Sequence, residues 1–567
     1  MLGPIRLRFV GLLVAVAWFP ATSVDSIAQD DVADLVEPTA AAEPDTTDPM
    51  KIEPATLRND ARRQPVRELA VVIDQHIADR WKASKVVPAE ACDDATYLRR
   101  VMLDTTGRIP RVSEIRAFLA DDSSDKRSRI VEQLLDSPGY ARHYAIVWRK
   151  VMIPEAASDF QARYLMPGFE GWLNQRLNAN TPYDELAREL LTVPLNGSAN
   201  AYSYQQGNFN PIAFYQAKQT KPENLAAASA RVFLGVRLEC AQCHDHPFDS
   251  WSREQFWSFT AFYSGIQRQR GSGNGVLASL RELFSKKKEG IRIPDTDTYV
   301  AAAYLDGTQP TDDSNPREVL AEWITAKENP YFARTAVNRM WGHLFGIGIV
   351  DPVDDFGKDN PPSHGELLDA LAREFAAREF DLKFLIEAIT TSKTYSLSSR
   401  LTHDSQLDSH LFARRAVKGM SAEQLYASLS IATGYRNDRN TDNPFAVDMN
   451  SEKARFQETF RNETDSPSER AMTILQTLAM MNGGLTTRAT TLDRSRTLAS
   501  VVDYPLFDAR ERVEALYLAV FSRKPQPEET ARLVKYVSAP KTDAERRKAY
   551  ANVFWALLNS SEFTTNH

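Results

Sequence analysis

Cysteine is scarce in this chain, and its scarcity excludes one class of fold. Only Cys92, Cys240 and Cys243 occur in 567 residues. Small secreted domains that are built on disulfides need many more crosslinks, so the fold must rest on an apolar core. Hydrophobic residues make up 43% of the sequence, which is enough for such a core and excludes wholesale disorder.

Long basic runs and the familiar catalytic motifs are also missing. Lys and Arg number 68 against 75 Asp and Glu, giving a net charge of −7, so nucleic acid is not an expected partner. The chain has no H-E-x-x-H element, no glycine-rich phosphate loop and no dinucleotide fingerprint. Whether the protein is an enzyme therefore stays open.

Long apolar runs are confined to the N-terminus. Arg6 and Arg8 precede an apolar run over residues 9–21, and small residues follow up to Ala28. This pattern is typical of a cleaved signal peptide, which we place at residues 1–28. The run is shorter than the roughly 20 residues that cross a bilayer, so we expect no membrane span after cleavage. An uncleaved anchor is the alternative. We expect the protein to be exported to the periplasm or beyond. Its expected binding partner is an envelope protein or a redox partner.

The remaining sequence divides by composition. Residues 29–65 are acidic and poor in large apolar residues, which predicts a disordered tether. Helical periodicity then dominates residues 66–265 and 313–567, while residues 266–312 shift to Gly, Ser, Lys and Pro and predict a linker or small insertion, with a short strand pair. The fold class is mainly α, with two helical domains. A polar stretch at 436–469 interrupts the second domain and is expected to be flexible.

Two capping boxes mark predicted helix starts. Ser252 and Gln255 stand three residues apart before an aromatic-rich helix, and Ser363 and Glu366 stand before a second helix. The second helix carries an apolar stripe at the spacing of one helical face: Leu367, Leu368, Leu371 and Phe375.

One motif points directly to chemistry. Residues 240–244 read C-A-Q-C-H. Covalent attachment of c-type haem needs two thiols at this spacing and a histidine directly after the second thiol to ligate the iron. Cys240 and Cys243 are therefore the predicted attachment residues, and His244 is the predicted ligand of the haem iron.

Three other interpretations of the motif stay open. Cys240 and Cys243 could form a disulfide, structural or redox-active. The two thiols with His244 or His246 could instead hold zinc, together with a remote ligand. In the third interpretation no cofactor is bound and the histidines only form hydrogen bonds within a buried turn.

Further ligands could come from the second half of the chain. Met340, His343 and His364 are candidates for a sixth haem ligand or a metal ligand, if the fold brings them to the motif. For each of them a place in the core or a capping role is the simpler interpretation. We also expect the turn that follows Leu238 to lie close to the interface between the two helical halves.

The sequence resembles a known family along most of its length. The run CAQCHDHPFD at 240–249 and the run RRVMLDTTGRIP at 99–110 resemble the N-terminal domain of secreted, planctomycete-specific cytochrome-like proteins. The second half is similar to the C-terminal partner domain of that family in several runs: NPYFAR at 329–334, VNRMW at 337–341, HLFG at 343–346, DPVDDF at 351–356, NPPSH at 360–364 and WALLNSSEF at 555–563.

The resemblance and the motif together give a first functional hypothesis. The chain is expected to be an exported cytochrome-like protein that binds c-type haem through C-x-x-C-H, for electron transfer or redox support. One alternative is a secreted binding or scaffold protein with a Cys240–Cys243 disulfide. Another is a metal-dependent hydrolase that uses the same turn, with zinc in place of haem.

Overall fold

The structure is a computed structural model that describes residues 60–195, 209, 211–269, 279–282, 290–311, 314–435, 451–461 and 467–567. The predicted signal peptide at 1–28 and the tether up to residue 59 lie outside the described residues. The described residues belong to one compact unit.

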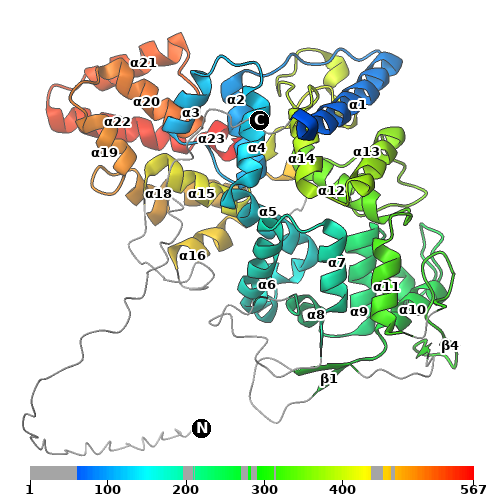
Figure 1. Ribbon diagram of the computed structural model, residues 1–567. Coiled ribbons are helices and arrows are strands. Elements are labelled where there is room, and N and C mark those ends of the chain that lie inside the picture. The colour runs from blue at the N-terminus through cyan, green and yellow to red at the C-terminus, as the bar shows by residue number, and fades with distance from the viewer. Residues whose placement is uncertain are drawn as a thin grey trace, which may run out of the picture. The chain divides into compact units, whose positions relative to one another are not determined.

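Helices dominate this unit, which confirms the predicted mainly-α class (Figure 1). The α-helices are α1 (Asp60–Ser84), α2 (Asp94–Thr106), α3 (Val112–Leu119), α4 (Lys126–Asp136), α5 (Pro138–Met152), α6 (Phe160–Asn178), α7 (Tyr183–Thr192), α8 (Ala213–Ala217), α9 (Pro222–Ser229), α10 (Arg253–Thr260), α11 (Pro316–Thr325), α12 (Phe332–Phe345), α13 (Gly365–Ala377), α14 (Leu382–Thr391), α15 (Ala422–Thr433), α16 (Glu452–Thr459), α17 (Ile474–Asn482), α18 (Gly484–Ala489), α19 (Arg496–Asp503), α20 (Ala509–Phe521), α21 (Pro527–Ser538), α22 (Asp543–Leu558) and α23 (Ser561–Thr564).

Short elements join these helices. The single-turn helices are η1 (Pro154–Ala157), η4 (Ala230–Leu234), η5 (Glu239–Gln242), η6 (Ala261–Tyr263), η7 (Asp404–Gln406), η8 (Ser409–Leu411) and η9 (Pro467–Glu469). The strands are β1 (Ile266–Gln269), β2 (Ser279–Glu282), β3 (Ile291–Arg292), β4 (Tyr299–Val300), β5 (Lys418–Gly419) and β6 (Thr565–Asn566). They pair antiparallel as β1–β2, β3–β4 and β5–β6, so the predicted linker does contain strand pairs.

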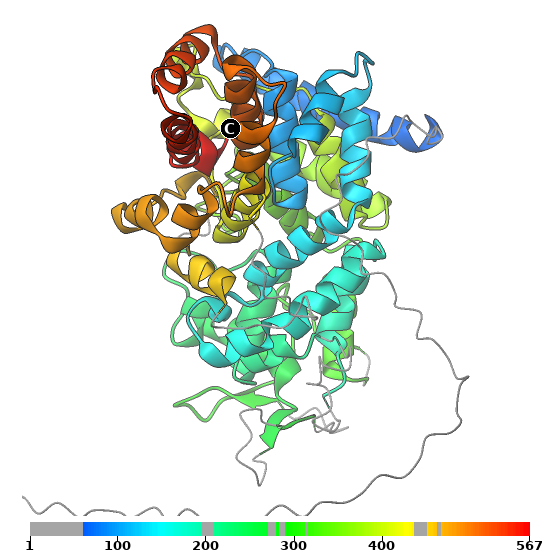
Figure 2. The same ribbon diagram turned by 90° about the vertical axis from the view of Figure 1, so that its left-hand side faces the viewer.

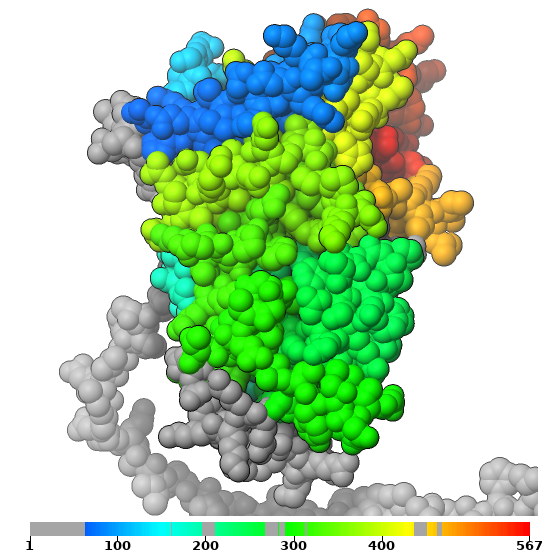
Figure 3. Space-filling model, turned by 90° about the vertical axis from the view of Figure 1, so that its right-hand side faces the viewer, coloured from blue at the N-terminus to red at the C-terminus, as the bar shows by residue number. Residues whose placement is uncertain are grey.

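The first helix begins earlier than the sequence predicted. α1 starts at Asp60, so the last residues of the predicted tether are helical. Arg63 explains the extension, because its guanidinium donates to the Glu132 carboxylate at 2.7 Å and 3.1 Å. Figure 3 shows α1 lying against the surface formed by α13 and α14, where Ile73 and Ile77 are fully buried.

A second correction concerns the polar stretch 436–469. Its described part contains α16, which Ser451 caps by accepting a hydrogen bond from Ala454 N. Phe456 and Phe460 stack at 4.3 Å between ring centroids and are buried. Two aromatic residues four apart are enough to dock one face of an otherwise polar helix.

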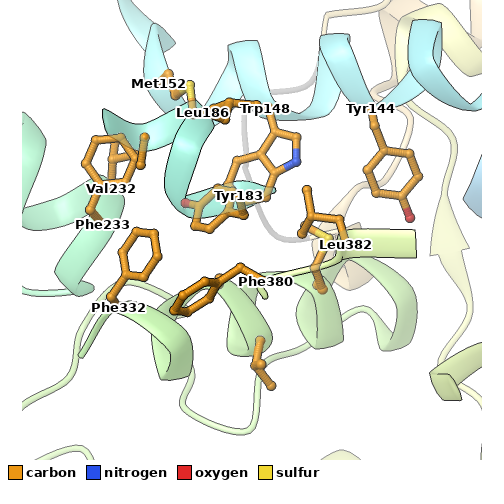
Figure 4. Packing of buried hydrophobic residues seen from close by; sticks show 14 of the residues in the cluster. Tyr144, Trp148, Met152, Tyr183, Leu186, Val232, Phe233, Phe332, Phe380 and Leu382 are labelled. Atoms are coloured by element: carbon orange, nitrogen blue, oxygen red, sulfur yellow. The ribbon is translucent and has the colours of Figure 1, made fainter. Parts of the chain in front are cut away.

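The first of two hydrophobic core clusters contains residues from both sides of the 266–312 segment. Figure 4 shows the rings of Tyr183, Phe233 and Phe332 near one another in this cluster, and the Tyr183 and Phe332 centroids lie 5.1 Å apart. The two halves of the sequence therefore share an apolar core.

The second cluster contains residues between Met420 and Phe563, together with Leu103 and Ile109. α2 therefore reaches both clusters, since Met102 belongs to the first and Leu103 to the second. In Figure 2 the C-terminal helices lie beside this part of the chain, and α20 contacts α3. The domain limits at 66–265, 266–312 and 313–567 stay predictions, because each cluster joins residues from both predicted domains.

No helix in the described parts of the chain is both long and apolar enough to cross a membrane.

Candidate functional site: the C-x-x-C-H turn

The motif forms a tight turn on the surface. η5 holds Cys240, and Cys243 follows directly in helical conformation. Ala241 N donates to Leu238 O at 2.9 Å, and both of these residues are fully buried. Both thiols are exposed. Residues three apart in a 3₁₀ turn lie on the same side of it, so we expect the two thiols to share the outer side.

The two motif histidines are oriented by local hydrogen bonds. His244 is exposed, and its Nδ1 lies 2.7 Å from the carbonyl oxygen of Asp245. A carbonyl only accepts, so Nδ1 carries the proton and the Nε2 lone pair is available to a ligand. His246 Nδ1 instead accepts from Phe248 N at 3.3 Å.

A buried aromatic side chain supports the turn. Trp257 in α10 is buried and donates from Nε1 to Gln242 O at 3.0 Å. α10 begins with the predicted capping box, in which Ser252 and Gln255 satisfy each other's backbone amides, and it lies beside α9 (Figure 1). Phe248, which follows the motif, is 77% exposed. The turn therefore rests on the buried Trp257 side chain, and the exposed Phe248 side chain follows it in the sequence.

The second half of the sequence contacts the segment that leads into the turn, as predicted. Phe356 N donates to Gly235 O at 2.9 Å. Arg237 Nη2 donates to the Asp354 carboxylate at 3.0 Å. The loop at 351–357 therefore lies next to the C-x-x-C-H turn.

Asp354 is the electrostatic centre of this contact. Burial alone would raise the pKa of its carboxyl, but Arg339, Arg231 and Arg237 outweigh burial and lower the pKa to about 2. The carboxylate is therefore ionised throughout the physiological range, and it accepts hydrogen bonds from Arg231 and Arg237.

The three remote ligand candidates do not join the turn. Met340 is 1% exposed within the first core cluster. His343 Nε2 donates to Asp104 O at 3.1 Å, and the His364 ring contacts the Phe412 ring at 5.4 Å. Burial lowers the pKa of both histidines to about 4, so they are neutral near pH 7.

Helix geometry explains why His343 is remote. Thr335, in the first turn of α12, lies under Gly235, where a β-carbon on that glycine would come 2.8 Å from Thr335 Oγ1. His343 stands eight residues further along α12, which is about 12 Å along the helix axis. It packs against His143 there, with ring centroids 5.6 Å apart.

The far end of α12 meets a buried polar cluster that the sequence analysis missed. Asp104 of α2 is 1% exposed and accepts from Lys418 Nζ at 2.5 Å, Arg415 Nη2 at 3.0 Å and Asn566 Nδ2 at 2.7 Å. The Tyr395 hydroxyl donates to the same carboxylate at 2.8 Å. The sequence signal was an aspartate that directly follows the apolar run Val101–Leu103, but its partners are too distant in sequence to be recognised.

Opposite charges and burial compete in this cluster. Burial alone would raise the pKa of Asp104, but Lys418 and Arg415 lower it, so the carboxylate is ionised. Burial lowers the pKa of Lys418 to about 7 in spite of Asp104. With every partner nearly inaccessible to solvent, we interpret the cluster as structural.

The cysteines and acidic residues offer no preformed metal cage in the described parts of the chain. All three cysteines are free thiols, and Cys92 is buried away from the motif. No group of three or more His, Cys, Asp or Glu side chains is placed to hold a metal ion among the described residues. A zinc site at this turn would need the side chains to rearrange.

Fold and site together define a mainly helical protein of two sequence regions, with an exposed C-x-x-C-H turn where the regions meet. Residues 72–268 match the family model PSCyt2, described as a protein of unknown function (DUF1549), and residues 316–464 match PSD1, described as a protein of unknown function (DUF1553). Together these matches cover more than half of the chain and place it in a two-domain family of unknown function. Comparison with curated proteins and with solved structures gives no match.

Proposed function

We propose that the C-x-x-C-H turn is a covalent attachment site for c-type haem, in an exported protein that transfers electrons or supports a redox partner. What supports this most is the shared outer side of Cys240 and Cys243, which leaves both thiols accessible to an attachment enzyme. When bound, the haem would supply one-electron chemistry.

The residues of the turn fit such a group in two further respects. His244 follows the second thiol, and its hydrogen bond to Asp245 O leaves Nε2 free to ligate iron. Phe248 follows the motif in the sequence, is exposed, and offers an apolar surface to a porphyrin edge. The role of the protein would be to hold these groups in register and leave one face open to a partner.

The test is maturation of the full chain in a host that exports it and carries the cytochrome c attachment machinery. We expect an intact mass increased by one haem, and a porphyrin absorbance that survives denaturation. Cys243→Ser should lose this retention, whereas the matched change Cys92→Ser should keep it, because Cys92 is buried elsewhere.

Three other results would each overturn the haem assignment. A mass reduced by two hydrogens indicates the disulfide and favours a secreted binding or scaffold protein. Stoichiometric zinc in elemental analysis indicates that the turn rearranges around a metal, as a metal-dependent hydrolase requires. An unmodified, metal-free protein means that the turn has only a structural role.

A further inference from the structure

Asp354 collects arginines from three separate segments. Its carboxylate oxygens lie 3.1 Å from Arg231 in η4, 3.0 Å from Arg237 just before η5, and 3.7 Å from Arg339 in α12. The Asp354 side chain is 11% exposed, and Arg339 is 5% exposed, whereas Arg237 is 47% exposed. The pairing therefore extends from the buried face of α12 to the surface where the turn begins.

Two of these arginines are also fixed by backbone carbonyls. Arg231 Nη2 donates to Val151 O at 2.8 Å, and Arg339 Nη2 donates to Arg231 O at 2.6 Å. Asp354 connects this fixed pair to Arg237, which belongs to the segment that carries the thiols. Without the carboxylate, three positive charges would face one another, and the two less exposed ones, on Arg231 and Arg339, would have little solvent to screen them.

The same loop contacts the chain on both sides of the motif. Before it, Gly235 has φ +68°, and a β-carbon there would lie 2.5 Å from the Phe356 ring, so this ring packs closely against the Gly235 backbone. Beyond the motif, the Asp249 carboxylate lies 2.8 Å from where a β-carbon on Gly357 would stand. Residues before and after the turn thus rest on the 351–357 loop.

From these contacts we infer that Asp354 is a positioning residue, which holds the C-x-x-C-H turn in the conformation that keeps both thiols on one side. The inference rests on the proposed function only for the reason why the turn needs a fixed conformation. Its physical content is the conformation of the turn in the haem-free protein, so it is tested there.

Amide hydrogen exchange measures directly how readily the turn opens. Asp354→Asn should increase exchange in residues 235–246 by roughly fivefold, as expected when a local opening becomes easier by about 1 kcal/mol. The matched control is Glu114→Gln, which neutralises a carboxylate that is at least as buried and that pairs with Arg108 at 2.7 Å, away from the turn. Glu114→Gln should leave exchange at 235–246 unchanged.

A second measurement separates positioning from general stability. In a glutathione buffer, oxidised glutathione converts the Cys240 and Cys243 thiols into one disulfide and releases two molecules of reduced glutathione. A turn with a fixed conformation keeps the thiols close together. Asp354→Asn should therefore lower the equilibrium constant for formation of the disulfide by about threefold or more. Asp354→Glu should restore it, because the carboxylate is retained.

The outcomes are decisive in either direction. If Asp354→Asn fails to fold, Arg237→Gln removes only the exposed arm and should show the same local increase in exchange and the same shift in the disulfide equilibrium. Unchanged exchange and equilibrium in the folded variants would overturn the inference. Absence of haem in the matured protein would overturn the proposed function and leave this inference intact.

Discussion

Two aspartates near α12 are similar in charge and different in setting. Asp354 pairs with Arg339 in the middle of the helix and with Arg237, which is half exposed. Asp104 lies at the far end, where Lys418 and Arg415 are at most 5% exposed. Asp354 thus has a partner that is open to solvent, whereas these two partners of Asp104 are closed to solvent. We expect this difference to set how much each group of ion pairs contributes to stability.

The largest effect should follow from Asp104→Asn. The substitution leaves Lys418 and Arg415 buried without a counter-charge, and breaking a buried ion pair in this way costs about 3–5 kcal/mol. Urea unfolding of the purified variant measures the loss. A cost below about 1 kcal/mol would mean that solvent reaches the cluster, and the contrast with Asp354 would fail.

Gly235→Ala should have the next largest effect. The residue has φ +68°, and its new β-carbon would meet the Phe356 ring at 2.5 Å, so strain and overlap together should cost about 2–3 kcal/mol. The thermal midpoint should fall accordingly. Gly307→Ala is the matched control, because that glycine also has positive φ but nothing within 4 Å. Equal losses for the two variants would show that the backbone angle alone matters.

The pH dependence of stability should reveal Asp354 itself. Its pKa is about 2 in the folded protein and about 4 in an unfolded chain, so its contribution of about 2 kcal/mol is present above pH 4 and is lost as the pH falls through 2. Urea midpoints measured from pH 6 to pH 2 should therefore converge for the wild type and Asp354→Asn. Parallel curves over this range would contradict the lowered pKa.

Arg237→Gln should have the smallest effect on stability. An ion pair that is half open to solvent contributes about 0–1 kcal/mol, so the urea midpoint should barely move. The local exchange around Cys240 should nevertheless increase. A large global loss without a local change would place Arg237 among the structural residues and would erase the contrast with the Asp104 cluster.

Local sequence patterns predicted local structure well. The Ser252–Gln255 capping box is present as expected, and the stripe from Leu367 to Phe375 is buried on one face of α13. Both signals come from residues at most eight positions apart, whose neighbours in a helix are fixed by its geometry. The position of the Cys turn beside the second half was also predicted, from the tendency of sites to lie between domains.

Other local signals failed because tertiary contacts compete with them. Ser363 does not cap α13, because its hydroxyl donates to Ile349 O at 3.0 Å instead. Ile474 and Leu475 of α17 were predicted in a helix and are helical, but they are 81% and 78% exposed. Apolar character predicts a preference for burial and cannot say what, if anything, covers a particular face.

The site residues divide in the same way. The motif at 240–244 was visible as a pattern. The roles of Asp354 and Asp104 depend largely on partners more than a hundred residues away, such as Arg237 and Arg415, which leave no periodic trace. His343 was singled out for its motif, yet its Nε2 is committed to Asp104 O. The sequence therefore identified the candidate reactive groups but not the long-range contacts around them.

The position of Asp104 also bears on the order in which the chain can assemble. Its partners Arg415, Lys418 and Asn566 follow it by 311, 314 and 462 residues. During synthesis, the Asp104 carboxylate of α2 therefore cannot pair with these residues until most of the chain has emerged. Contacts of such long range close large loops and slow folding, so we expect refolding to be slow and the early chain to depend on chaperones. Pulsed hydrogen exchange should show α2 gaining protection only together with β5 and β6.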